Sequence, residues 1–112
     1  MVEQKITREM QEKIQELQML QQRMQLFGAQ KQQFQMQMIE TENALGEVEK
    51  SKSSVYRLVG EILVEKPCDE IKKELKEKKE ELELRIKTLD KQEAKTKESA
   101  LALQKELSAA LK

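Results

Sequence analysis

The sequence predicts a mainly α-helical fold, a long antiparallel two-helix coiled coil whose helices are joined by one β-hairpin. Three observations support this prediction. Apolar residues recur with a seven-residue period over most of the 112 residues, which is typical of a coiled coil. The chain has only three glycines and one proline, so long helices can run without interruption. A single stretch, residues 55–66, is rich in β-branched residues, which favour strands.

The first helix is predicted over residues 3–54, which contain no proline. Taking Leu17 as position a, apolar side chains occupy most a and d positions over about seven heptads. Five apolar residues fall outside this seam: Ile14, Met19, Leu26, Met36 and Ile39. Scattered exposed apolar residues are common, but methionine is also favoured on adaptable binding surfaces. Both interpretations of these five residues stay open.

Residues 55–66 are predicted to form a β-hairpin, with Gly60 and Glu61 in a type II′ turn. This turn places Val59 opposite Ile62 and makes both faces of the hairpin apolar. A two-stranded hairpin is marginal in water, so these faces and the two open edges require strands from other chains. The residues predicted to mediate assembly are Val55, Tyr56, Leu58, Val59, Ile62, Leu63 and Val64.

The second helix is predicted over residues 69–112, after Pro67. Pairing a with a and d with d across the two helices places Lys31 opposite Glu93. This register leaves the residues before about Glu12 without partners and predicts an apolar free end that grips unfolded proteins. The residues predicted at this client-binding end are Ile6, Met10, Ile14, Met19, Leu101, Leu103, Leu107 and Leu111.

The composition argues against several classes of function. There is no histidine, no phosphate-binding glycine loop and no C-x-x-C motif, and Cys68 is the only cysteine. We therefore expect neither an enzyme nor a cofactor or metal site. Lysine plus arginine and aspartate plus glutamate are 21 each, which argues against nucleic acid or an anionic membrane as partner. Because no apolar run approaches the length of a membrane span, we expect a cytoplasmic protein.

The hairpin sequence VYRLVGEILV resembles the V-Y-K-L-x-G-x-(I/V)-L-V hairpin of the prefoldin family, and its single hairpin resembles the β-type subunit. The resemblance covers residues 1–112 as one prefoldin-type domain, and the lysine- and glutamate-rich second helix resembles archaeal members. It implies an ATP-independent chaperone in which two α-type and four β-type subunits form a hexamer, with the hairpins joined as β-barrels. It also implies that the coiled-coil ends hold unfolded proteins and deliver them to a group II chaperonin. The alternative is a structural coiled-coil tether or adaptor that holds no client.

Overall fold

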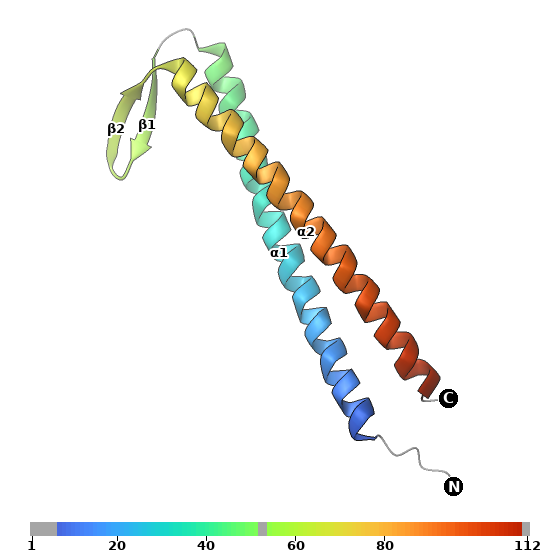
Figure 1. Ribbon diagram of the computed structural model, residues 1–112. Coiled ribbons are helices and arrows are strands. Elements are labelled where there is room, and N and C mark those ends of the chain that lie inside the picture. Colours follow the sequence, from blue (N-terminus) through green and yellow to red (C-terminus); the bar gives the residue numbers. More distant parts are fainter. Residues whose placement is uncertain (1–6, 52–53, 111–112) are drawn as a thin grey trace. The chain divides into compact units, whose positions relative to one another are not determined.

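The computed structural model describes residues 7–51 and 54–110 (Figure 1). The elements follow the order α1 (Arg8–Lys50), β1 (Val55–Val59), β2 (Ile62–Lys66) and α2 (Cys68–Ala110). The two strands form one antiparallel two-stranded sheet. The predicted fold class, two long helices with a hairpin between them, is confirmed.

The helix ends follow local capping chemistry. The Thr7 hydroxyl accepts a hydrogen bond from the backbone N–H of Met10 at 3.2 Å, which caps the start of α1. α1 ends at Lys50, short of the predicted end at residue 54, and the Ser51 backbone N–H donates to the Val48 carbonyl at 3.2 Å, the shorter spacing typical of a helix end. α2 begins at Cys68, one residue before the predicted start, and Asp69 lies in its first turn.

The chain forms two compact units, which we describe separately. The terminal unit comprises Met1–Lys31 and Thr88–Lys112, and the hairpin unit comprises Gln32–Lys87. Within each unit a segment of α1 runs alongside an antiparallel segment of α2, and the hairpin unit also holds β1 and β2 (Figure 1).

The interior of both units is the predicted heptad seam. Every buried residue in the described ranges occupies a predicted a or d position: Leu89, Ala100, Leu103 and Leu107 in the terminal unit, and Thr41, Val48 and Leu82 in the hairpin unit. The buried Thr41 hydroxyl donates a hydrogen bond to the Gln37 carbonyl at 2.7 Å, so this polar group is satisfied. The heptad pattern is therefore confirmed as the source of the coiled coil.

The predicted register between the helices is wrong by about one helical turn. The Lys31 ammonium lies 2.6 Å from the Asp90 carboxylate instead of pairing with Glu93, and Lys13 lies 3.3 Å from Glu106. In a heptad the step from a to d is three residues and the step from d to the next a is four. The second helix runs in the opposite direction and presents these two steps in reverse order. The steps of the two helices match only when each position a lies level with a position d of the other helix, so pairing a with a cannot maintain both spacings.

The ion pair between Lys31 and Asp90 makes the stability of the coiled coil depend on pH. The hydrogen bond to Asp90 raises the pKa of the Lys31 amine above 10.5. A raised lysine pKa means that the pair stabilises the fold below pH 10.5, and that this contribution is lost as the pH rises through the folded-state pKa.

Asp90→Asn should therefore lower the Tm at pH 7, and only modestly because the pair is partly exposed. The difference from the wild-type chain should shrink as the pH rises well above 10.5, in melts followed by circular dichroism. Glu98→Gln, an exposed acid on the same helix, serves as the control and should change little at either pH. A difference that persists unchanged at high pH would assign the effect of Asp90→Asn to something other than the Lys31 charge.

Candidate functional site

The hairpin has the predicted pairing and the predicted turn. Its antiparallel pairs are Val55 with Lys66, Tyr56 with Glu65, Arg57 with Val64, Leu58 with Leu63, and Val59 with Ile62. Gly60 has φ +62°, and no non-glycine residue in the described ranges has positive φ. A positive φ only at the first central residue is the geometry of a type II′ turn, which matches the twist of the strands.

Both faces of this hairpin carry exposed apolar side chains. The exposed large apolar residues of the two strands are Tyr56, Leu58, Val59, Ile62, Leu63 and Val64, whereas Val55 is half-buried. Because the sheet has two strands, the outer edge of each strand also has unpaired backbone groups. The hairpin is therefore a surface with the apolar area and the free strand edges that joining other chains requires.

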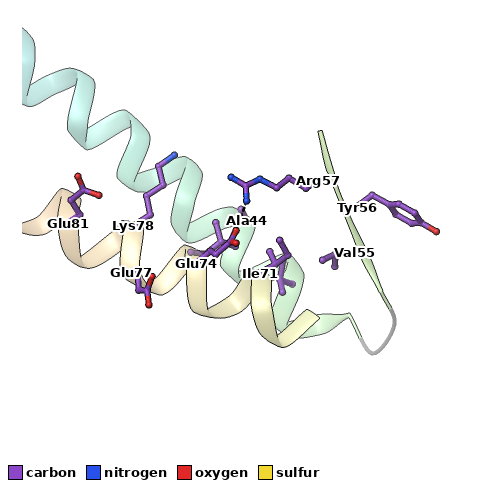
Figure 2. Close-up of a pocket in the computed structure, with 11 residues that line it drawn as sticks. Ala44, Val55, Tyr56, Arg57, Ile71, Glu74, Glu77, Lys78 and Glu81 are labelled. Atoms are coloured by element: carbon purple, nitrogen blue, oxygen red, sulfur yellow. Dashed lines mark hydrogen bonds and ion pairs between the residues drawn. The ribbon is translucent and has the colours of Figure 1, made fainter. Parts of the chain in front are cut away.

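One side of the hairpin faces the helix ends of its own unit. The Arg57 guanidinium lies 2.7 Å from the Glu74 carboxylate of α2. In Figure 2, Arg57 and Val55 point toward the helices and Tyr56 points away from them. A groove of about 720 Å³ lies on this side. The apolar and aromatic residues that line it are Ala44, Val48, Val55, Tyr56, Ile71 and Leu75.

Cys68 has a structural role that the sequence did not reveal. Its thiol donates hydrogen bonds to the Val48 carbonyl at 3.3 Å and to the Ser51 carbonyl at 3.7 Å. The Val48 carbonyl also accepts a hydrogen bond from the Ser51 backbone N–H at 3.2 Å, so the thiol adds a second donor at the end of α1. The side chain thus ties the end of α1 to the start of α2.

The residues predicted at the client-binding end differ in how far the structure exposes their side chains. Ile6 and Leu111 lie outside the described residues. Met19 and Leu101 are 57% and 50% exposed, and both belong to the terminal unit. Met10 and Ile14 are half-buried, so Met10 is not the unpartnered overhang that the predicted register implied.

Leu103 and Leu107 do not belong to this exposed set. Both are buried, at 9% and 7% exposure, because they occupy d and a positions of the α2 seam. In this structure their side chains therefore lie in the seam and not on the exposed apolar surface. Of the residues predicted at the client-binding end, Met19 and Leu101 are therefore the exposed candidates, and Leu26 of the same unit is 56% exposed.

Sequence reasoning missed two grooves in the terminal unit. Grooves of about 420 Å³ and 290 Å³ are both lined by Leu20 and Ser99. Ala102 also lines the first groove, and Phe27 and Thr96 also line the second. Small residues on α2 thus leave large α1 side chains reachable from outside. The signal in the sequence was the small residues at 96, 99 and 102, which lie close together on one helix.

A second set of exposed apolar residues lies in the hairpin unit. Met36, Ile39 and Leu84 are exposed, and a groove of about 510 Å³ is lined by Met38, Leu84 and Ile86. Met36, Ile39 and Leu84 are about as exposed as Met19 and Leu101. They therefore provide a matched comparison when the binding of unfolded proteins is tested.

Two features that would indicate other functions, a metal site and a membrane-spanning helix, are not found among the described residues. Within residues 7–51 and 54–110, no group of three or more acidic or cysteine side chains could hold a metal ion. None of the described helices is apolar enough over a sufficient length to cross a membrane.

Comparison with known proteins identifies the family. A model of the prefoldin subunit family matches residues 11–112. The prefoldin subunit beta of Archaeoglobus fulgidus is 43% identical over 94 residues, which cover 82% of this chain and 81% of the relative. That of Thermococcus kodakarensis is 37% identical over 99 residues, covering 87% of this chain and 85% of the relative.

Two solved structures are also similar. The crystal structure of the prefoldin beta subunit from Thermococcus strain KS-1 has a TM-score of 0.88 at 36% identity and covers 98% of each chain. The prefoldin beta2 subunit from the same strain has a TM-score of 0.68 at 26% identity, covering 78% of this chain and 95% of that chain. The chain therefore belongs to the prefoldin family, as a subunit of the β type.

Proposed function

We propose that this chain is a subunit of an ATP-independent chaperone that captures unfolded proteins and delivers them to a group II chaperonin. Membership of the prefoldin family gives it a chaperone-like role, in a family of non-enzymatic subunits. The observation that supports the finer function best is that exposed apolar side chains occur both on the hairpin and in the terminal unit.

The hairpin is the proposed assembly surface. Its apolar residues lie on both faces, and its strand edges are open. Partner strands would bury the apolar side chains and pair the open edges at the same time. The proposed partners are α-type prefoldin subunits and further copies of this chain, two of the former with four of the latter. In this assembly the hairpins join as β-barrels, which have no open edges.

The terminal unit is the proposed client-holding surface. Met19 and Leu101 are exposed, and the grooves beside Leu20 can accept apolar side chains of an unfolded protein. The proposed surface also includes Ile6 and Leu111, which lie outside the described residues. Fully burying one such side chain contributes about 1.5–3 kcal/mol, so a single contact is weak. Several subunits acting on one client raise the strength through effective concentration and still allow release.

An aggregation assay tests this function. A chemically denatured client is diluted into buffer with the chain assembled with an α-type subunit, without nucleotide, and light scattering is followed. We expect scattering to be suppressed, with no further effect of ATP until a group II chaperonin is added to take over the client. We propose the cytoplasm as the setting of this activity. Unchanged scattering would favour the structural tether, which needs no client-holding surface.

A further inference from the structure

We propose that the groove of about 290 Å³ in the terminal unit binds segments of unfolded proteins in which an apolar residue lies next to an acidic one. Leu20 and Phe27 would contact the apolar side chain, and Arg23 and Lys95 would bind the carboxylate. This inference rests on the proposed function, in which the terminal unit holds unfolded clients. It goes further because it assigns a charge preference to one groove and names the side chains that produce the preference.

The charged residues that line this groove are both cations. Arg23 comes from α1 and Lys95 from α2, and both side chains are exposed, whereas the other lining residues are uncharged. Arg23 lies three residues after Leu20 and four residues before Phe27, a spacing that places the three side chains on the same face of the helix. An apolar side chain that contacts Leu20 and Phe27 would therefore have a positive charge beside it.

Arg23 makes no ion pair within the described part of the chain. The other three arginines, Arg8, Arg57 and Arg85, lie 3.8, 2.7 and 2.8 Å from glutamate carboxylates. Lys95 likewise makes no ion pair within residues 7–51 and 54–110. A guanidinium is a planar donor that can bind a carboxylate through two parallel hydrogen bonds. Arg23 is therefore the arginine whose charge remains available to a carboxylate of another molecule.

The neighbouring groove of about 420 Å³ has a different charge. Its lining contains Glu16 and Glu106 but only one cation, Lys13. The Lys13 ammonium lies 3.3 Å from the Glu106 carboxylate, so its charge is compensated within the chain. An acidic segment would meet the negative charge of Glu16 in this groove, whereas no acid lines the groove beside Arg23. The preference for acidic segments should therefore belong to the groove beside Arg23.

Binding of short labelled peptides to the full chain tests this preference, with fluorescence anisotropy as the measurement. Three unstructured peptides of equal length differ at one position beside a leucine, which holds glutamate, glutamine or lysine. We expect the glutamate peptide to bind about three- to five-fold more tightly than the glutamine peptide, since an exposed ion pair contributes only modestly. The lysine peptide should bind more weakly than both, and the differences should shrink at high salt.

Charge reversal at the groove provides the sharper test. Arg23→Glu combined with Lys95→Glu should reverse the order, so that the lysine peptide binds more tightly than the glutamate peptide. Lys97→Glu combined with Lys105→Glu makes the same total change of charge at exposed residues of the same unit that do not line the groove, and should keep the wild-type order. Circular dichroism checks that both variants remain helical, and the glutamine peptide should bind all three proteins similarly.

The other outcomes overturn the assignment. Equal affinity of the wild-type chain for the glutamate and glutamine peptides would show that the groove has no charge preference, as would the same change of order in both double variants. If aggregation is still suppressed in that case, the proposed function stands and only the preference is wrong. If none of the three peptides binds, the terminal unit has no such groove for clients and both proposals fail.

Discussion

Leu58→Asp is expected to abolish the higher oligomer and leave a helical monomer. Leu58 is 66% exposed and pairs with Leu63 across the hairpin, so both side chains lie on the same face. In the monomer the new carboxylate is solvated, so the fold loses little. In the assembly it is buried without a partner, which costs several kcal/mol for each subunit. Sedimentation velocity measures the loss of the oligomer, and circular dichroism measures the retained helix.

Leu84→Asp is the matched control for this variant. Leu84 is 65% exposed and lies on α2, outside the hairpin, so the same change in chemistry is made at nearly equal exposure. The control should sediment as the wild type does. An unchanged oligomer in Leu58→Asp would remove the assembly role from this face of the hairpin.

The second large effect is expected at the terminal unit. Met19→Gln combined with Leu101→Gln removes two exposed apolar side chains without touching the buried seam. The variant should assemble and melt as the wild type does, because neither side chain is buried. Its protection of a denatured client should fall severalfold, since each lost contact contributes about 1.5–3 kcal/mol when buried and the loss is repeated in every subunit. Light scattering at equal protein concentration measures the effect.

Met36→Gln combined with Ile39→Gln is the control for the location of binding. These residues are 59% and 58% exposed and lie in the hairpin unit, so the amount of apolar surface removed is comparable. This control should protect the client as the wild type does. If it loses protection and the Met19 and Leu101 variant does not, clients are held along the hairpin unit instead.

The helices and the hairpin could be predicted from the sequence because their signals are local. The seven-residue period specifies which side chains are buried, and Val48 and Leu82 are buried where it places them. A glycine followed by glutamate between two β-branched stretches specifies the turn, and Gly60 has the positive φ that this turn requires. Such patterns need no knowledge of the partner helix.

The register and the exposed end could not be predicted in the same way. They depend on how one helix is placed against the other, and Lys31 can reach either Asp90 or Glu93 with a shift of one turn. The period places Leu107 in the seam and Met19 outside it, but the prediction assigned both to one apolar end because it took that end to lack partners. The role of the Cys68 thiol could not be predicted either, because its acceptors lie at and just beyond the end of α1, far from Cys68 in the sequence.

Site-specific photo-crosslinking tests the central claim, that the hairpin joins subunits while the terminal unit holds clients. A photoreactive amino acid replaces either Leu58 or Met19, and the assembled chaperone is irradiated with a labelled denatured client. We predict that position 58 crosslinks to other subunits and not to the client, and that position 19 crosslinks to the client. Client crosslinks from position 58 and none from position 19 would contradict this division between the two surfaces.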